Sequence, residues 1–158
     1  MLLLGLLCLI SFSSSAAEPY TLFFTRHAEK INSSSQDPAL TDVGHQRAGH
    51  LARFLKNSRI QAVFSTDYRR TRQTALPLAQ QLNVELTIYD PRQLTALANT
   101  IIERKENVLI VGHSNTTPDL VTLVGGAAEP IHESSYGKLY AVRIENDHRS
   151  TQVYTIDP

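Results

Sequence analysis

Two histidines and a cluster of arginines follow apolar segments of this sequence, at the points where strands would end. Arg26 and His27 form the first pair, the cluster lies at residues 69–72, and His113 comes third. Arginine carries a permanent charge and a planar fork of donors that fits phosphate oxygens. A neutral histidine can attack phosphorus and form a covalent phosphohistidine. These residue types predict one pocket in which two arginines and two histidines hold a phosphoryl group.

Ser114, directly after His113, is expected to orient a neighbouring side chain or to bind the phosphate. A serine nucleophile is not predicted, because this segment lacks the Gly-x-Ser-x-Gly turn that presents such a serine. Metal binding is not predicted either, since His45 and His50 are five residues apart on an expected helix, a poor spacing for ligands on one face. We therefore expect no metal and no cofactor.

Apolar segments typical of buried strands alternate with amphipathic helical patterns from residue 20 onward. The expected strands cover residues 20–25, 61–65, 84–89, 108–111, 138–145 and 151–156. The expected helices begin after Thr41 as N-cap, near residue 75, near residue 94 and after Thr117 as N-cap. Pro77 is expected to delay or kink the second helix. This order predicts an α/β fold, a three-layer sandwich with a mostly parallel central sheet and helices on both faces.

The order of the elements also predicts where the chemistry lies. Ligands of open parallel sheets bind at the carboxyl ends of the strands. The segments that carry His27, the arginine cluster and His113 each follow a predicted strand. All three segments should therefore meet at the same edge of the sheet.

Residues 1–17 have the pattern of a secretory signal peptide. An apolar run precedes small residues at Ser15 and Ala17, and we predict cleavage after Ala17. The run is about half the length of a membrane span; a short membrane anchor and a buried first strand are the alternatives. Residues 18–158 then form a single domain without cysteine, because Cys8 is the only one. We expect a periplasmic or secreted protein without stable membrane insertion after cleavage.

The charges of the whole chain are balanced, with 15 Lys and Arg against 15 Asp and Glu. Such a balance argues against a nucleic acid or an anionic membrane as partner. The arginine cluster stands out against this background, although by itself it would be typical of a solvated helix face. The expected partner is a small phosphorylated substrate.

Three blocks of the sequence together resemble the histidine phosphatase superfamily, the phosphoglycerate mutase-like group. The block Thr25-Arg-His-Ala-Glu-Lys30 is similar to its Arg-His-Gly signature, with alanine in place of glycine. Residues 70–75 (Arg-Thr-Arg-Gln-Thr-Ala) and 111–116 (Val-Gly-His-Ser-Asn-Thr) are similar to its second block and its second-histidine block. The resemblance spans residues 20 to 145 and implies the fold predicted above.

The resemblance also implies roles for individual residues. His27 would be the phosphorylated nucleophile, and Arg26, Arg70 and His113 would clamp the phosphate. Arg70 is chosen from its cluster because it stands three residues before Gln73, as the family's arginine does. The family is metal-independent, which agrees with the expectation from the histidine spacing.

The general acid has no clear counterpart in the family's pattern. Asp90, at the end of the third expected strand, lies at the correct edge of the sheet and is the first candidate, although an aspartate before proline is also an ordinary turn residue. Asp119, in the first turn of the fourth expected helix, is the second candidate. Glu29 is the third candidate and Glu133 the fourth.

These features predict a phosphoric monoester hydrolase that acts through a phosphohistidine on His27 without a metal. A phosphoglycerate mutase-like phosphotransferase is one alternative, which the short chain disfavours because such mutases carry inserted segments. A non-catalytic phosphate-binding module is another alternative. A phosphohistidine-protein phosphatase fits the compact size, but the predicted signal peptide disfavours it.

Overall fold

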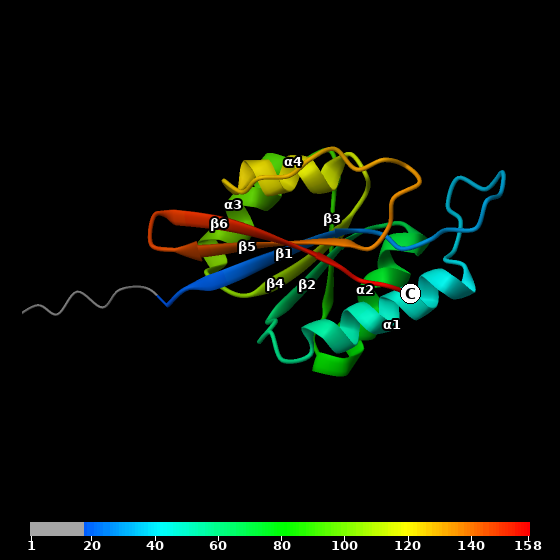
Figure 1. Cartoon of the computed structure of the whole chain (residues 1–158), viewed down its shortest axis with the longest axis horizontal. Helices are drawn as coiled ribbons and strands as arrows, with labels where there is room; N and C mark the ends of the chain where they lie inside the picture. Colours follow the sequence, from blue (N-terminus) through cyan, green and yellow to red (C-terminus); the bar gives the residue numbers. More distant parts are fainter. Residues whose placement is uncertain (1–17) are drawn as a thin grey trace, which may run out of the picture.

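A six-stranded sheet in the order β3-β2-β4-β1-β5-β6 forms the centre of the molecule (Figure 1). The computed structural model describes residues 18–158, and the predicted signal peptide, residues 1–17, lies outside them. The first four strands run parallel, and β5 pairs antiparallel with both β1 and β6, which confirms the mostly parallel sheet. The strands are β1 (Tyr20–Arg26), β2 (Ala62–Thr66), β3 (Leu86–Tyr89), β4 (Val108–Gly112), β5 (Lys138–Glu145) and β6 (His148–Thr155).

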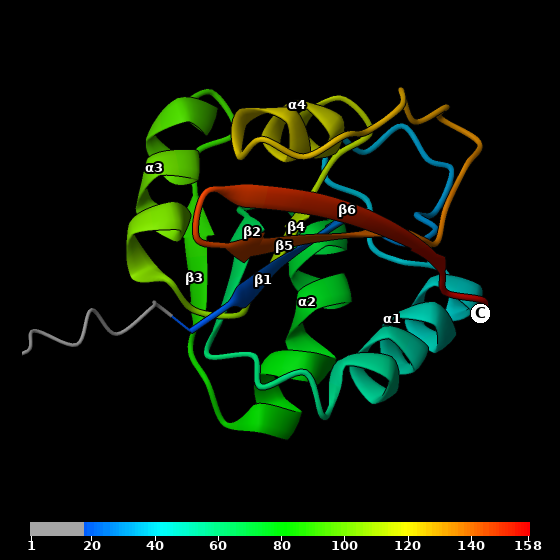
Figure 2. The same cartoon turned by 60° about the vertical axis from the view of Figure 1, so that its left-hand side comes forward.

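Four helices cover the two faces of this sheet. They are α1 (Asp42–Leu55), α2 (Arg69–Leu82), α3 (Leu94–Arg104) and α4 (Thr116–Leu123). Helices α1 and α2 pack together on one face, and α3 and α4 on the other (Figure 1, Figure 2). This arrangement is the predicted three-layer sandwich. None of the helices within residues 18–158 is long and apolar enough to cross a membrane.

Strand β1 is buried from both sides. Leu22 and Phe24 belong to the core under α3 and α4, whereas Phe23 points to the opposite face and packs in the core under α1 and α2. Successive side chains of a strand alternate between faces, so a central strand needs apolar residues at consecutive positions. The double burial fixes the end of β1, where the candidate catalytic residues begin.

Thr41 is the N-cap of helix α1, as predicted. The Thr41 hydroxyl accepts a hydrogen bond from the Gly44 amide at 3.1 Å. Gly44 also lies directly against the segment that follows β1. A Cβ atom at Gly44 would come within 2.3 Å of the carbonyl oxygen of Glu29. Both atoms are fixed to the backbone, so no rotamer change can relieve that contact.

The substitution Gly44→Ala should therefore destabilise the fold by more than about 2 kcal/mol, although alanine favours helices. Gly49→Ala is the matched control in the same helix, because a Cβ there would meet only the Arg53 side chain, at 3.6 Å. The control should stabilise the protein by up to about 1 kcal/mol. Urea unfolding curves give both values, and equal midpoints for the two variants would contradict the close approach at Gly44.

Two of the predicted helix starts are wrong. Helix α2 begins at Arg69, and Pro77 lies inside it. Proline cannot donate the backbone hydrogen bond of a helix interior, and the packing of the buried face that includes Ala75 and Leu78 on the sheet offsets this loss. Helix α4 begins at Thr116 rather than after Thr117. The Thr116 hydroxyl accepts a hydrogen bond from the His113 amide, which precedes the helix, and this contact brings the helix start forward.

Candidate active site

The carboxyl ends of β1, β2 and β4 meet at one edge of the sheet and bring the predicted segments together. Arg26 pairs with Gly112 in the β1–β4 register, and the His27 amide donates to the Gly112 carbonyl at 3.0 Å. His27 and His113 thus follow adjacent strands, with ring centroids 5.7 Å apart. Strand β2 lies on the other side of β4 and leads into α2, which carries Arg70.

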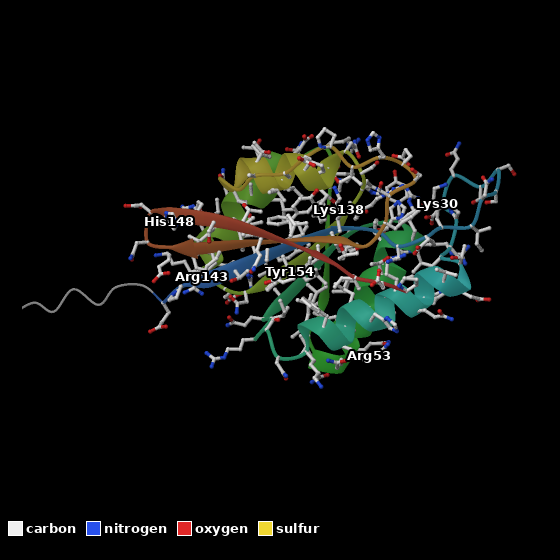
Figure 3. All side chains as sticks on the ribbon, viewed as in Figure 1. Lys30, Arg53, Lys138, Arg143, His148 and Tyr154 are labelled. Atoms are coloured by element: carbon white, nitrogen blue, oxygen red, sulfur yellow. The ribbon has the colours of Figure 1, made fainter. Side chains whose placement is uncertain are left out.

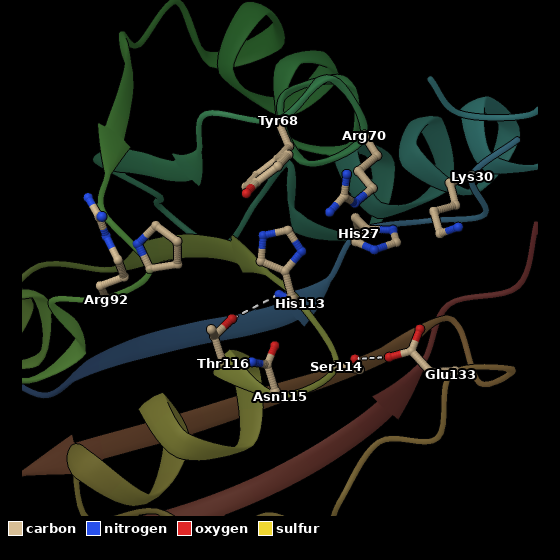
Figure 4. Close-up of a pocket in the computed structure, with 11 residues that line it drawn as sticks. His27, Lys30, Tyr68, Arg70, Arg92, His113, Ser114, Asn115, Thr116 and Glu133 are labelled. Atoms are coloured by element: carbon tan, nitrogen blue, oxygen red, sulfur yellow. Dashed lines mark hydrogen bonds between the residues drawn. The ribbon is translucent and has the colours of Figure 1, made fainter. Parts of the chain in front are cut away.

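A pocket of about 420 Å³ opens at this edge (Figure 4). Four of the predicted residues line it, namely His27, Arg70, His113 and Ser114. Glu133, the fourth candidate for the general acid, also lines it. The other lining residues, which the sequence did not single out, are Lys30, Tyr68, Pro91, Arg92, Asn115 and Thr116. Three cationic side chains in this lining face a single carboxylate, so the pocket suits an anion.

The His27 ring is held in the tautomer that a nucleophile needs. Its Nδ1 lies 2.7 Å from the carbonyl oxygen of Ala28, which can only accept, so Nδ1 carries the proton and Nε2 keeps its lone pair. Burial lowers the pKa of His27 to about 3, and the charges of Arg26 and Arg70 act in the same direction. The ring is therefore neutral near pH 7 and has one nitrogen free to attack.

Ala28 replaces the glycine of the family signature without narrowing the pocket. Its methyl group packs in a small buried cluster with Leu40 and Ala48. Its amide donates to the Thr74 hydroxyl at 3.0 Å, which ties the segment after β1 to α2. Because the methyl group points into this cluster, Ala28 is absent from the pocket lining.

His113 is oriented by two buried threonines that the sequence did not reveal. Its Nε2 lies 3.0 Å from the Thr66 hydroxyl, which donates in turn to the Thr71 hydroxyl at 2.9 Å. The Thr66 oxygen therefore accepts from Nε2–H, and Nδ1 is the unprotonated nitrogen of the neutral ring. Burial lowers the pKa of His113 to about 4, reinforced by the nearby charge of Arg70.

The Arg70 guanidinium is available to an incoming anion. It stacks on the Tyr68 ring, 4.4 Å from the ring centre. Its Nε is buried without a hydrogen-bond partner among residues 18–158, and the nearest carboxylate oxygen, on Asp37, is 3.9 Å from Nη1. A planar fork with unused donors in a pocket is suited to phosphate oxygens.

Arg26 has a structural task that the sequence did not predict. Its buried Nη1 donates to the carbonyls of His132, Glu133 and Ser135, and the Tyr136 ring covers its guanidinium at 4.3 Å. Its Nη2 donates to the Glu133 carboxylate at 2.9 Å. Its Nε is buried without a hydrogen-bond partner among residues 18–158, as that of Arg70 is, so its predicted role in phosphate binding stays a prediction. Arg26 holds the segment 132–136 against the end of β1.

Of the four carboxylates considered as general acid, only Glu133 lines the pocket. Asp90 lies in an adjoining hollow, where hydrogen bonds from Arg92 lower the pKa of its carboxyl to about 2. Asp90 is absent from the lining of the pocket that contains His27, and its role as general acid stays a prediction. Glu29 is engaged by an arginine of α1, and Asp119 lies outside the pocket.

Two hydrogen bonds hold the Glu133 carboxylate at the pocket. One carboxylate oxygen accepts from the Ser114 hydroxyl (Figure 4), and the other from Arg26. The hydrogen bond from Ser114 lowers the pKa of Glu133, and the charge of Arg26 adds to this effect. Ser114 thus orients a neighbour, one of its two predicted roles. Glu133 stands in a segment without a recognisable pattern, which is why sequence reasoning ranked it last.

Comparison with known proteins agrees with this arrangement. The model of the histidine phosphatase superfamily (branch 1) matches residues 22–92, which include His27 and Arg70. No curated protein matches the sequence. Among solved structures, the protein histidine phosphatase SixA complexed with tungstate is similar, with a TM-score of 0.66 and 19% identity. The match covers 87% of this chain and 97% of SixA.

Two further structures have the same fold at low identity. A mycobacterial glucosyl-3-phosphoglycerate phosphatase is 11% identical with a TM-score of 0.62, over 89% of this chain and 99% of its own. YhfR of Bacillus stearothermophilus is 18% identical with a TM-score of 0.62, over 86% of this chain and 96% of its own. Residues 22–92 thus match the model of the histidine phosphatase superfamily, and the chain has the fold of these solved structures over most of its length.

Proposed function

We propose that this protein is a phosphatase that hydrolyses phosphate esters through a phosphohistidine on His27. The observation that carries the proposal is the state of the His27 ring. The Ala28 carbonyl holds Nδ1–H, and Nε2 stays unprotonated in a pocket with excess positive charge. SixA, which has a similar fold, forms a complex with tungstate, a tetrahedral oxyanion, and this supports the binding of a phosphoryl group by this protein.

The reaction has two steps. In the first, Nε2 of His27 bonds to phosphorus while the bond from phosphorus to the leaving oxygen breaks. Arg70 donates to the non-bridging oxygens and offsets their charge. His113 donates as well once its Nδ1 has taken up a proton, which the negative charge of the bound phosphate favours. In the second step, water attacks phosphorus, the bond to His27 breaks, and inorganic phosphate leaves the pocket.

Glu133 takes the place of Asp90 as the proton donor in this proposal. It protonates the leaving oxygen in the first step and recovers a proton from the attacking water in the second. The carboxylate is ionised in the free protein, so its pKa has to rise when substrate binds. A phosphate dianion beside the carboxylate has this effect, because like charges disfavour ionisation.

Release of phosphate from p-nitrophenyl phosphate by residues 18–158 in excess EDTA tests the proposed function. We expect turnover that EDTA does not reduce, because protein side chains supply every group of the mechanism. Turnover that requires added zinc or magnesium would contradict a metal-free site. Tight vanadate binding without turnover of aryl or alkyl phosphates between pH 4 and 8 would instead indicate a non-catalytic phosphate-binding module.

A further inference from the structure

We infer that Thr71 is a positioning residue that decides which ring nitrogen of His113 carries the proton. Acting through the Thr66 hydroxyl, it keeps Nδ1 of His113 free of a proton, so that a dianion binds in the pocket together with one proton from solution. The inference rests on the proposed function and deepens it, because it concerns the charge state in which the pocket receives a phosphate ester. Thr71 itself does not line the pocket, and the His113 ring is hydrogen-bonded to Thr66 instead.

The direction of each hydrogen bond between Thr71, Thr66 and His113 follows from the acceptors beside Thr71. The Thr71 hydroxyl lies 2.9 Å from the carbonyl oxygens of Thr66 and Tyr68, which can only accept, so its single proton points to them. Thr71 Oγ1 therefore accepts from the Thr66 hydroxyl, also at 2.9 Å. The Thr66 proton is committed in turn, and Thr66 Oγ1 accepts from Nε2–H of His113 at 3.0 Å.

Burial makes this direction binding on the ring. Thr66 and Thr71 are both 0% exposed, so water does not compete for their hydroxyl groups. A ring with its proton on Nδ1 would set the lone pair of Nε2 against that of Thr66 Oγ1, or leave a buried hydroxyl unpaired, and either is unfavourable. The neutral ring therefore carries its proton on Nε2. Nδ1, which has no hydrogen bond within residues 18–158, is the nitrogen left for a ligand of the pocket.

The charged groups around His113 keep the ring neutral in the free protein. Burial lowers the pKa of His113 to about 4, and the charges of Arg70 on α2 and Arg26 on β1 act in the same direction, whereas Glu133 raises it. The His27 ring, itself neutral near pH 7, lies 5.7 Å away between the ring centroids. At pH 6.5 the free His113 ring thus has no proton to offer from Nδ1.

A bound dianion changes this balance. The other titratable side chains of the pocket lining are Lys30, Tyr68 and Arg92. Tyr68 meets the His113 ring edge-on, with centroids 5.2 Å apart, and Arg92 is already bound by Asp90. Added negative charge favours the imidazolium form, so the pKa of His113 is low in the free protein and rises in the complex. A dianion should accordingly bind more tightly as the pH falls from the higher of these two values towards the lower.

Sulfate is the probe for this proton, because at pH 6.5 it is a tetrahedral dianion that carries none of its own. Titration calorimetry in buffers of different ionisation enthalpy counts the protons taken up with it. The Glu133→Gln background removes the carboxyl group whose pKa also rises when a dianion binds. In this background we expect about one proton per bound sulfate.

Thr71→Val keeps the size of the side chain but removes the acceptor of the Thr66 proton. The Thr66 hydroxyl then donates to Nε2, the ring proton moves to Nδ1, and His113 can donate to the oxyanion as a neutral ring. Uptake with sulfate should fall to about zero. Thr71→Ser should restore it. Thr117→Val is the matched control, because the Thr117 hydroxyl is also buried but has no hydrogen-bond partner among residues 18–158.

Nitrogen-15 NMR of the histidine rings reads the position of the proton directly. We expect the proton of the free His113 ring on Nε2 in the wild type, in Thr71→Ser and in Thr117→Val, and on Nδ1 in Thr71→Val. Sulfate should protonate both nitrogens of the wild-type ring. Figure 3 shows His148 at the end of the molecule opposite the pocket residue Lys30, so the His148 ring is the internal reference and should not respond to sulfate.

The results separate the inference from the proposed function. A wild-type ring with its proton on Nδ1 overturns the inference without any variant, and so does an unchanged ring in Thr71→Val or the absence of proton uptake with sulfate. A reversed ring in Thr71→Val, in a protein whose wild type forms no phosphoenzyme, supports the inference and overturns the phosphatase proposal. A phosphoenzyme together with an unchanged ring has the opposite meaning.

Discussion

His27→Ala should reduce kcat for p-nitrophenyl phosphate by about ten-thousand-fold or more, to the level of background hydrolysis. The variant removes the only atom that can bond to phosphorus in the proposed mechanism. Water would then have to attack the ester directly, without the covalent intermediate that divides the reaction into two easier steps. Continuous release of p-nitrophenolate gives kcat, and retained turnover would contradict the covalent mechanism.

Two controls make the loss in His27→Ala interpretable. His45→Ala replaces an exposed histidine of α1 that is not part of the pocket, and its kcat should equal that of the wild type. Calorimetric binding of inorganic phosphate to His27→Ala shows whether the pocket is still formed. A phosphoenzyme should be recovered from the wild-type protein after quenching in alkali, where phosphohistidine is stable, and not from His27→Ala.

Glu133→Gln should lower kcat/KM for alkyl phosphates by about a hundredfold. An alkoxide is a poor leaving group and needs a proton, whereas p-nitrophenolate departs almost unassisted. Turnover of p-nitrophenyl phosphate should therefore fall by no more than about threefold. Glutamine can still accept from Arg26 through its oxygen and can donate to the Ser114 hydroxyl through its amide nitrogen, so the substitution removes the proton and keeps the position.

The pH dependence of the same reaction gives a second readout for Glu133. Its pKa is lowered in the free protein, so the protonated form becomes common only as the pH falls towards that lowered value. Alkyl phosphate turnover should accordingly rise on acidification in the wild type and stay flat in Glu133→Gln. Asp90→Asn is the matched control and should behave like the wild type. An effect in Asp90→Asn but not in Glu133→Gln would return the acid role to Asp90.

The sheet and the meeting of the three segments could be predicted because they depend on local patterns. Consecutive apolar residues such as Leu22, Phe23 and Phe24 identify a strand buried on both faces. The helical patterns between successive strands then indicate that the strands run parallel. Ligands of parallel sheets lie at the edge formed by the carboxyl ends of the strands. Only the order of elements is needed for this argument.

The directions of long side chains could not be predicted in the same way. Arg26 stands at the end of β1, where an arginine would ordinarily be expected to meet the phosphate. Its Nη1 group donates to carbonyls that begin 106 residues further along the chain. No spacing rule connects Arg26 with the segment 132–136, so sequence patterns miss both the contact and the resulting position of Glu133.

Asp90 illustrates the opposite case, in which a neighbour in sequence decides the direction of the side chain. The aspartate does follow β3, as predicted, but Arg92 is only two residues away and its guanidinium folds back onto the carboxylate. The pattern Asp-Pro-Arg contains this ion pair, yet it is equally compatible with an aspartate that faces the pocket. Local charge pairing decides between these two geometries, and the spacing of the strands does not.

The contacts of Arg26 have a consequence for how the protein becomes active during synthesis. The attacking histidine and Arg70 emerge from the ribosome before the segment 132–136. The partners of the Arg26 guanidinium, and the carboxylate that completes the pocket wall, are made only when the chain has reached Ser135. A nascent chain that ends before this point contains the reactive ring without its assembled surroundings. Chemical competence is thereby delayed until the segment 132–136 has been made.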